Sequence, residues 1–380
     1  MRAEYGLIGG RLGHSFSPRI HRELGGYDYE LVEIAPEEVG TFLRTVPFRG
    51  INVTIPYKQT VIPFLDEISE NARRIGSVNT ILRRRDGSLI GDNTDDPGFR
   101  GMLRQAGIDP AGRKCLVLGS GGASRTVVAC LGEMGAREVR VISRRGEDNY
   151  GNLEKHRDAE IIVNATPVGM YPDNGAAPLK LEAFPALQGV ADLIYRPART
   201  ALLLEAERLG IRWVNGLYML TEQARCACGI FLGRSLPEAE TDRVTALLAA
   251  DTANLILASP GGKAAAAAGR ALGERTGRKL ADGAGMTGGE IREAGKETGL
   301  ILTLDTETAA REEHRDALRQ NGILFRLGEG REGDLWDACV RAENPVRAAE
   351  EILAALPRLA PGLNGLRPRE GDGRKEGKQR

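Results

Sequence analysis

The sequence predicts an α/β protein built around a doubly wound parallel sheet. Between residues 98 and 216, short apolar runs alternate with helical segments, and these runs are apolar on both faces. Strands of that kind are typical of a parallel sheet covered by helices on both sides. The first of them ends in a glycine-rich turn that leads into a helix. With 380 residues, the chain is long enough for two or three domains.

Charge and hydropathy narrow the functional classes. The 52 basic and 52 acidic side chains balance, so no overall field attracts nucleic acid or an anionic membrane. No stretch approaches the roughly 20 apolar residues of a membrane helix, and the start lacks a signal-peptide pattern. We therefore expect a cytoplasmic protein that contacts neither nucleic acid nor membrane. The five cysteines form no disulfide pattern, and the spacing of Cys226 and Cys228 is not that of a zinc site, so we expect no metal.

The first region, residues 1–97, mixes short strands with helices and ends in a hairpin that turns at Asp86-Gly87. Polar residues gather after its strands. Thr54 lies on a strand that Pro56 ends, and Lys58 follows in what we expect to be the first turn of a helix. Taken singly, such residues are common in turns and helix caps.

The second region, residues 98–216, carries the glycine-rich turn. A strand ends at Gly119, and Gly121 and Gly122 lead into a helix that we expect to begin near Ser124. Glycines allow backbone N–H groups to approach a pyrophosphate at the positive end of that helix, so the turn predicts a dinucleotide. The next strand ends in Arg144 and Arg145 instead of an acidic residue, and guanidinium groups suit a 2′-phosphate. The pattern therefore favours NADP over NAD.

Three further segments follow. A helix over about 217–245 is expected to fold back onto the first region and complete it. A third region, 250–356, opens with an apolar strand, a Gly-Gly-Lys turn and an alanine-rich helix. Residues 357–380 are rich in Gly, Pro and charge, and we predict a disordered tail.

Eight motifs occur in one order: GHSFSP, GINVTIPYK, GSVNT, GDNTD, VLGSGGASR, NATPVGM, DLIYRPART and NGLYMLTEQ. Together they resemble shikimate dehydrogenase over residues 1 to about 245. The resemblance implies an amino-terminal α/β substrate lobe and a Rossmann-like NADP lobe. It also implies reversible, NADP-linked reduction of 3-dehydroshikimate to shikimate, a step of chorismate and aromatic amino-acid biosynthesis.

The resemblance assigns the site residue by residue. It implies that Lys58 and Asp95 are the catalytic pair, with the ammonium supplying charge and a proton to the reacting oxygen. The substrate-binding residues that it implies are Ser15, Ser17, Thr54, Asn79, Tyr195 and Gln223, with the two serines and the tyrosine on the carboxylate. The cofactor-binding residues that it implies are Gly119, Gly121, Gly122, Ala123, Ser124, Arg144, Arg145, Asn164, Thr166, Gly216 and Met219. His14 is expected to be an ordinary turn residue.

This chain departs from the family pattern in three places. Ser143-Arg144-Arg145 stands where Asn-Arg-Thr is common, which keeps the arginine expected on the phosphate of NADP. Asp96 stands where glycine is common, so the start of the helix there is expected to differ. The loop after Arg145 is short for a full helix, so we expect a trimmed crossover.

The third region resembles shikimate kinase, but most of the chemistry of that family is missing. A phosphate-binding loop reads G-x-x-x-x-G-K-[ST], whereas here Leu257 stands at the first glycine and Ala264 follows Lys263. The substrate and magnesium acids are reduced to Asp282. Since phosphoryl transfer depends on positioned charge, we expect a degenerate domain. A scaffold or homodimerisation element is favoured over a nucleotide or shikimate sensor, and a working kinase comes last.

Two alternatives stay open for the whole chain. One is a quinate/shikimate dehydrogenase, which the Ser15 and Ser17 pair disfavours. The other is a non-catalytic sensor of shikimate-pathway compounds, which the intact Lys58 and Asp95 disfavour.

Overall fold

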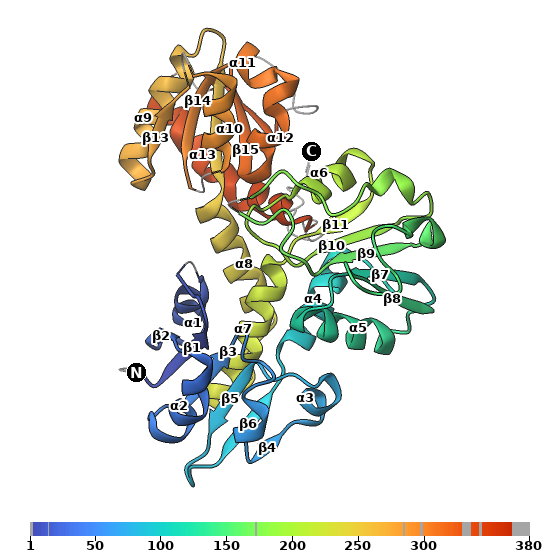
Figure 1. The fold of residues 1–380 in the computed structure, drawn as a ribbon. Coiled ribbons are helices and arrows are strands. Elements are labelled where there is room, and N and C mark those ends of the chain that lie inside the picture. Colours follow the sequence, from blue (N-terminus) through green and yellow to red (C-terminus); the bar gives the residue numbers. More distant parts are fainter. Residues whose placement is uncertain are drawn as a thin grey trace, which may run out of the picture. The chain divides into compact units, whose positions relative to one another are not determined.

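Two units make up the chain, Met1–Thr245 and Ala246–Arg380. The computed structural model describes residues 3–13, 15–171, 173–283, 286–296, 299–328, 336–341 and 344–366. Each unit is a mixed α/β structure, as the sequence predicts (Figure 1). In the described part of the chain, no helix has both the length and the apolar character needed to cross a membrane.

The first lobe of the first unit holds a six-stranded sheet in the order β2-β1-β3-β5-β6-β4. Its strands are β1 Tyr5–Gly9, β2 Tyr29–Glu33, β3 Gly50–Val53, β4 Glu67–Ile68, β5 Thr80–Arg83 and β6 Leu89–Asp92. Strands β5 and β6 pair antiparallel, which confirms the predicted hairpin. The helices are α1 Ser17–Gly25, α2 Val39–Thr45 and α3 Glu70–Ile75, with 3-10 turns η1 Pro36–Glu38 and η2 Ile62–Phe64.

The second lobe is a five-stranded parallel sheet in the order β11-β10-β9-β7-β8. Its elements are β7 Lys114–Leu118, α5 Gly122–Glu133, β8 Glu138–Ile142, η3 Leu153–His156, β9 Ile161–Asn164, η4 Leu181–Ala183, β10 Gly189–Asp192, α6 Ala201–Arg208 and β11 Arg212–Val214. The strand order reverses between β7 and β9, and ligands of doubly wound sheets bind at such a point. The crossover after β8 contains only η3, as the short loop predicts.

Helices α4, Asp95–Ala106, and α7, Leu217–Leu232, pack against each other through glycine. A Cβ on Gly98 of α4 would lie 2.8 Å from the Met219 carbonyl oxygen and 3.0 Å from the Gln223 Cβ of α7. Helix α7 also packs on the first lobe, where Phe231 joins an apolar cluster with Tyr5 and Tyr29. Helix α7 therefore returns to the first region.

The prediction of one helix over 217–245 is wrong. Gly233, with a φ of 64°, ends α7, and Pro237 follows in the connection. Gly and Pro together are strong helix stops, because glycine adopts the left-handed conformation and proline lacks an N–H. A separate helix, α8 Ala239–Thr252, then runs past the expected boundary at residue 250.

The second unit holds a parallel sheet in the order β13-β14-β12-β15-β16. Its elements are β12 Asn254–Ser259, α9 Lys263–Thr276, β13 Leu280–Asp282, α10 Gly288–Lys296, β14 Ile301–Asp305, α11 Thr306–Ala310, α12 Glu312–Asn321, β15 Gly322–Leu327, β16 Ala338–Val340, α13 Pro345–Leu359 and η5 Ala360–Asn364. Its core contains Ile256, Leu302 and Leu324.

The predicted start of a disordered tail at residue 357 is too early. Helix α13 continues to Leu359, and η5 buries Leu363, which is 3% exposed. The apolar positions 356, 360 and 363 recur at helical spacing, so they have a core to cover. The rest of the predicted tail, from residue 367, lies outside the described residues.

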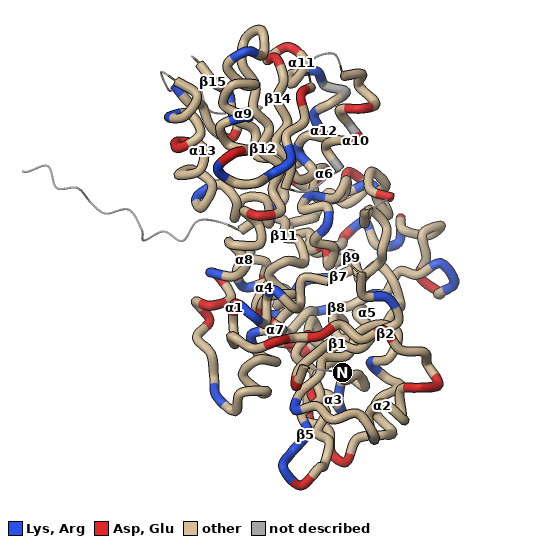
Figure 2. The backbone as a smooth tube through the Cα atoms, turned by 90° about the vertical axis from the view of Figure 1, so that its left-hand side faces the viewer, with Lys and Arg blue, Asp and Glu red and all other residues tan. Residues whose placement is uncertain are grey.

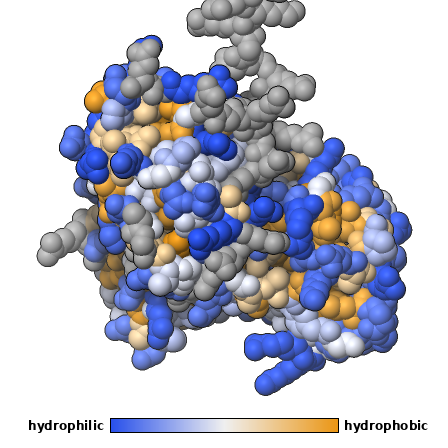
Figure 3. Space-filling model, turned by 90° about the horizontal axis from the view of Figure 1, so that it is seen from above, coloured by the Kyte–Doolittle hydropathy of each residue, from blue (hydrophilic) through white to orange (hydrophobic). Residues whose placement is uncertain are grey.

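Charged residues of both signs are interspersed along the backbone (Figure 2). On the face seen in Figure 3, hydrophilic residues predominate and hydrophobic residues form separated patches. Among the described residues, Figure 2 shows no broad stripe of one charge, in keeping with the balanced composition.

Candidate active site

Lys58 and Asp95 form an ion pair, with Lys58 Nζ 2.6 Å from Asp95 Oδ2. The two side chains are only 18% and 11% exposed, so little water competes for the contact. Asp95 is the first residue of α4. Lys58 lies in consecutive turns over residues 55–61, and not in a helix as predicted. Pro56 and Pro63 lack a backbone N–H, so neither can donate a helical hydrogen bond in this part of the chain.

Asn79 holds the other oxygen of the same carboxylate. Its Nδ2 donates to Asp95 Oδ1 over 3.0 Å, and its Oδ1 accepts from the Thr94 N–H over 2.7 Å. Asn79 Nδ2 also lies 3.5 Å from Gln223 Oε1 of α7. The structure therefore brings Lys58, Asn79, Asp95 and Gln223 together from separate parts of the sequence.

Thr54 follows β3 and is half-buried, with its methyl group facing Gly9. On the same strand, Asn52 is 5% exposed and bonds to Tyr29 Oη, the Asn79 carbonyl oxygen and Thr80 Oγ1. These bonds fix β3 against β5 and so support the backbone on either side of Lys58 and Asn79.

Ser15 and Ser17 face each other, with their hydroxyl oxygens 3.0 Å apart. Ser17 is the first residue of α1, and its N–H donates to Ser15 Oγ over 3.2 Å. Between them, Phe16 packs on Tyr195, with ring centroids 5.7 Å apart. Burial raises the pKa of the Tyr195 phenol, so it stays a neutral donor. His14 lies outside the described residues.

The glycine-rich turn lies between β7 and α5, at the point where the strand order reverses. Gly119 has a φ of 103°, and a Cβ there would lie 3.0 Å from Thr166 Cγ2. Apart from their chain neighbours and the backbone of α5, no described atom lies within 4 Å of where a Cβ of Gly121 or Gly122 would stand, and no side chain caps α5. Helix α5 begins at Gly122, so Ala123 and Ser124 belong to its first turn. Open space beside an uncapped helix N-terminus fits a phosphate group.

Arg144 and Arg145 follow β8 and are both exposed. Among the described residues, neither forms an ion pair with a carboxylate of the protein, whereas the nearby Arg140 pairs with Glu138 at 2.6 Å. Two unpaired guanidinium groups beside the turn suit the 2′-phosphate of NADP.

Asn164 cannot contact a cofactor through its side chain, contrary to the prediction. It is 0% exposed, its Nδ2 donates to Asp192 Oδ1 over 3.0 Å, and its Oδ1 accepts from Thr166 N and Oγ1. Its amide is fully used in holding the end of β9. Thr166, which is half-buried and faces Gly119, stays at the surface of the turn.

Asp192, at the end of β10, was not predicted from the sequence. It is 0% exposed and accepts hydrogen bonds from Asn164, Thr200 Oγ1 and the Ile194 N–H. Burial raises the pKa of this carboxyl to about 7, although those hydrogen bonds oppose the rise. An acidic residue inside the apolar run GVADLIY was the available signal, because carboxyl groups are rarely buried without a partner.

Gly216 and Met219 stand at the start of α7. Gly216 is buried against the backbone of Leu193, so no larger residue fits there. Met219 is half-buried, and Gln223 lies one turn further along the same helix. One helix therefore carries residues predicted for both the cofactor and the substrate.

Comparison with known proteins gives the family. The model of the shikimate dehydrogenase substrate binding domain matches residues 7–81. The NADP-dependent shikimate dehydrogenase of Syntrophomonas wolfei is 38% identical over 263 residues, covering 61% of this chain and 90% of that protein. The chain belongs to the shikimate dehydrogenase family.

Solved structures of shikimate dehydrogenases share the fold. A chorismate mutase/shikimate 5-dehydrogenase fusion protein from Clostridium acetobutylicum is 38% identical, with a TM-score of 0.61 over 64% of this chain and 96% of that one. Shikimate 5-dehydrogenase from Thermus thermophilus, solved with NADP(H) and shikimate, is 36% identical, with a TM-score of 0.56 over 63% and 97%. These relatives confirm the predicted mixed α/β fold with parallel sheets. Within the described part of the chain, no group of three His, Cys, Asp or Glu side chains is placed to hold a metal.

Proposed function

We propose that this chain reduces 3-dehydroshikimate to shikimate with NADPH, reversibly, as a step of chorismate biosynthesis. The observation that carries the proposal is the Lys58–Asp95 pair, at 2.6 Å and largely shielded from water, in a chain of this family. The alternatives of a quinate-preferring enzyme and a non-catalytic sensor share the fold, so they are separated by the experiment below.

Lys58 and Asp95 are suited to the proton transfer. When bound, the nicotinamide supplies the hydride for the ketone carbon. Lys58 then stabilises the negative charge that develops on the ketone oxygen and donates the proton that completes the alcohol. Asp95 orients the ammonium through Oδ2, while Asn79 holds Oδ1 and so fixes the rotation of the carboxylate. In the oxidative direction, a neutral Lys58 accepts the proton from the alcohol.

Ser15 and Ser17 suit the carboxylate of the substrate. Two hydroxyls 3.0 Å apart offer donors to two carboxylate oxygens, and neither brings a charge that must be desolvated. The Tyr195 ring contacts Phe16 between the two serines, and we expect its phenol to be a third donor to the carboxylate. Thr54, Asn79 and Gln223 are then left for the hydroxyl groups of the ring.

NADP fits the second lobe. The backbone of Gly119, Gly121, Gly122, Ala123 and Ser124 would hold the pyrophosphate at the start of α5. Arg144 and Arg145 would hold the 2′-phosphate. Thr166, Gly216 and Met219 would line the path to the nicotinamide. Asn164 would act indirectly, by fixing Thr166.

The test is a steady-state assay of the purified full chain, followed at the NADPH absorbance band. Shikimate and quinate are each offered with NADP and with NAD. We expect the highest kcat/KM for shikimate with NADP. A higher value for quinate would make the chain a quinate dehydrogenase. Shikimate binding by calorimetry without turnover in any combination would make it a sensor.

The second unit supports a separate proposal, a shikimate kinase-like domain that has lost phosphoryl transfer. Its first strand, β12, lies in a parallel sheet and is followed by a short turn over residues 260–262. Leu257, at the position of the first loop glycine, is 0% exposed inside β12. Residues 257–259, which would belong to a phosphate-binding loop, are therefore part of the strand β12.

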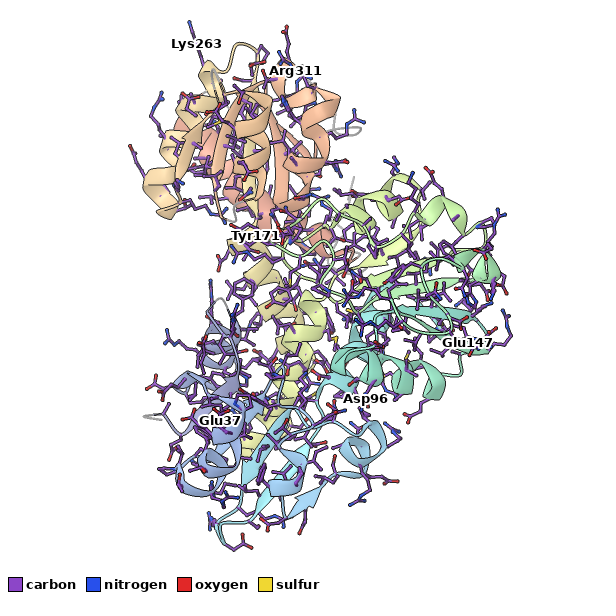
Figure 4. The ribbon with its side chains drawn as sticks, viewed as in Figure 1. Glu37, Asp96, Glu147, Tyr171, Lys263 and Arg311 are labelled. Carbon is purple, nitrogen blue, oxygen red and sulfur yellow. The ribbon has the colours of Figure 1, made fainter. Side chains whose placement is uncertain are left out.

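The turn itself uses its own donors. Gly262 N–H donates to the Ser259 carbonyl oxygen over 2.9 Å, and Ala265 N–H donates to Ser259 Oγ over 3.0 Å. Lys263 is exposed and points away from the ribbon (Figure 4). Asp282 bonds to Thr303. We expect a scaffold or a homodimerisation element, and ATP-dependent formation of shikimate 3-phosphate by the purified chain would refute this.

A further inference from the structure

Four charged side chains join helices α3, α4 and α5. Arg74 of α3 and Arg100 of α4 both pair with Glu133 at the end of α5. Arg100 Nε also lies 2.7 Å from Oδ1 of Asp96, and Arg74 lies 3.9 Å from Oδ2 of the same carboxylate. We call Arg74, Asp96, Arg100 and Glu133 the α3–α4–α5 cluster. Its two positive and two negative charges balance, so the ion pairs within the cluster neutralise it without a bound counter-ion.

Asp96 is the member that lies deepest. Its side chain is 13% exposed, and the buried Cys130 thiol of α5 donates to Asp96 Oδ1 over 2.7 Å. Burial raises the pKa of that thiol, and the hydrogen bond to Asp96 raises it further, so the thiol stays a donor at neutral pH. Figure 4 labels Asp96 near the start of α4. The Asp96 carboxylate therefore contacts side chains of all three helices.

The neighbouring Asp95 serves a different set of groups. Asp95 binds Lys58 and Asn79, whereas Asp96 binds Arg100 and Cys130. The amide N–H groups of both residues donate to Asn93 Oδ1, over 3.0 and 3.3 Å. Consecutive side chains held by different partners fix the rotation of the first helical turn. A shift at Asp96 must therefore move Asp95.

The cluster also reaches Asn79. Arg74 is next to the last residue of α3, and Gly76 ends that helix three residues before Asn79. In this segment, Val78 N–H donates to the Lys58 carbonyl oxygen over 2.8 Å. Glu133, by binding Arg74 and Arg100, thus connects the two chain segments that hold the carboxylate of Asp95.

We propose that Asp96 is a positioning residue, which keeps the Asp95 carboxylate on Lys58 by fixing the first turn of α4. The inference rests on the proposed roles of Lys58 and Asp95. Productive geometry in such pairs tolerates displacements of only about 0.5 Å, so a loosened helix start is enough to reduce turnover. Asp96 replaces the glycine common in the family, and it brings contacts that a glycine cannot make.

The test compares Asp96→Ala with Asp96→Asn in the full chain. Asp96→Ala removes both carboxylate oxygens, and we expect kcat for shikimate oxidation to fall about tenfold. The KM values for shikimate and for NADP should each change less than about twofold. Asp96→Asn keeps an oxygen for Arg100 and Cys130 and should recover most of kcat. The rate of acetylation of Lys58, measured by mass spectrometry, should rise several-fold in Asp96→Ala, because a displaced Asp95 protects the amine less.

Lys114→Met is the matched control. Lys114 is buried at the start of β7 and pairs with Asp158 at 2.8 Å, so its loss lowers stability at the far end of the strand from the glycine turn. We expect a lower Tm with unchanged kcat and unchanged Lys58 acetylation. If Asp96→Ala does not fold, Glu133→Gln replaces it as the test variant. For Glu133→Gln we expect a smaller fall in kcat and a smaller rise in the rate of Lys58 acetylation.

A folded Asp96→Ala enzyme with the kcat of the parent would overturn the proposal. A lower kcat with unchanged acetylation of Lys58 would also overturn it, since the loss would then not pass through the Lys58–Asp95 pair. If the parent chain lacks shikimate turnover, the proposed function fails, and the acetylation rates still decide whether Asp96 positions Asp95.

Discussion

The rings of Phe16 and Tyr195 lie with their centroids 5.7 Å apart and their planes at 45°. Phe16 stands between the two serines of the first lobe, and Tyr195 follows β10 of the second. This contact places the Tyr195 ring against the residue that separates Ser15 from Ser17.

Removing these hydroxyls should weaken substrate binding more than turnover. Ser15→Ala and Ser17→Ala each delete one donor to the substrate carboxylate, and we expect KM for shikimate to rise about tenfold for each, since such a bond contributes roughly 1.5 kcal/mol. Tyr195→Phe should raise KM similarly while its ring stays on Phe16. Steady-state kinetics with saturating NADP measure the effect. An unchanged KM in all three variants would exclude the carboxylate assignment.

Loss of the amine at position 58 should act on the chemical step. In Lys58→Ala, no group stabilises the alkoxide or transfers the proton, so kcat should fall at least about 100-fold while KM changes less. The exposed Lys180 provides a control, because it forms no ion pair with any of the described residues and Lys180→Ala removes only its amine. Turnover of Lys58→Ala close to that of the control would refute the acid–base assignment.

Cofactor preference should depend on the two arginines after β8. Replacing both Arg144 and Arg145 by alanine removes the guanidinium groups proposed for the 2′-phosphate, so KM for NADP should rise at least about tenfold and KM for NAD should hardly change. The exposed Arg208 on α6 is the control position. Equal losses for NADP and NAD would show that these arginines do not distinguish the phosphate.

Asp192 should give stability a dependence on pH. Its pKa is about 7 in the folded chain and about 3.9 when unfolded, so between these values the folded state binds the extra proton. The free energy of unfolding therefore falls as the pH rises through this window. Asp192→Asn cannot ionise, and relative to the parent it should gain up to about 4 kcal/mol between pH 4 and pH 8. Urea unfolding at a series of pH values measures the difference.

Asp158→Asn is the contrasting variant for this measurement. The hydrogen bond from Lys114 lowers the pKa of Asp158, so its contribution to stability is present at neutral pH and is lost as the pH falls. The two substitutions should thus change the pH dependence in opposite directions. A parallel response would mean that Asp192 is not the group responsible.

The first unit should work without the second. A chain ending after Thr252 keeps α8 whole and retains every residue proposed for substrate and cofactor. We expect its kcat for shikimate to lie within about twofold of that of the full chain. Mass in solution, measured for both forms, tests whether the second unit contributes to self-association. A large loss of activity in a folded truncated chain would mean that the second unit takes part in catalysis.

Much of the first unit could be predicted from its sequence, because the pattern was local. Apolar runs gave the strands of the parallel sheet, and Asp86-Gly87 gave the hairpin. The resemblance to shikimate dehydrogenase implied Lys58 and Asp95 as a pair, and the structure puts them in contact. Their catalytic roles remain a prediction.

What the sequence did not predict depends on tertiary contacts. Asn164 stands in a motif next to the cofactor turn, but only the fold shows that Asp192 takes its amide. The interactions of Asp96 with Cys130 and Arg100 join two helices that are separate in sequence. The Gly, Pro and charge content of residues 357–380 predicts a disordered tail, whereas α13 continues to Leu359 and Leu363 has a core to cover.

The close approach of α4 and α7 at Gly98 has a consequence for engineering. Asp95 stands at the start of α4, and Met219 and Gln223 stand on α7. The residues proposed for proton transfer and for substrate and cofactor binding therefore lie along one close helix–helix contact. Even the methyl group of an alanine at position 98 would force the two helices to move apart. A redesign for a bulkier alcohol should therefore enlarge the site near Ser15 and Ser17 and leave the contact between α4 and α7 unchanged.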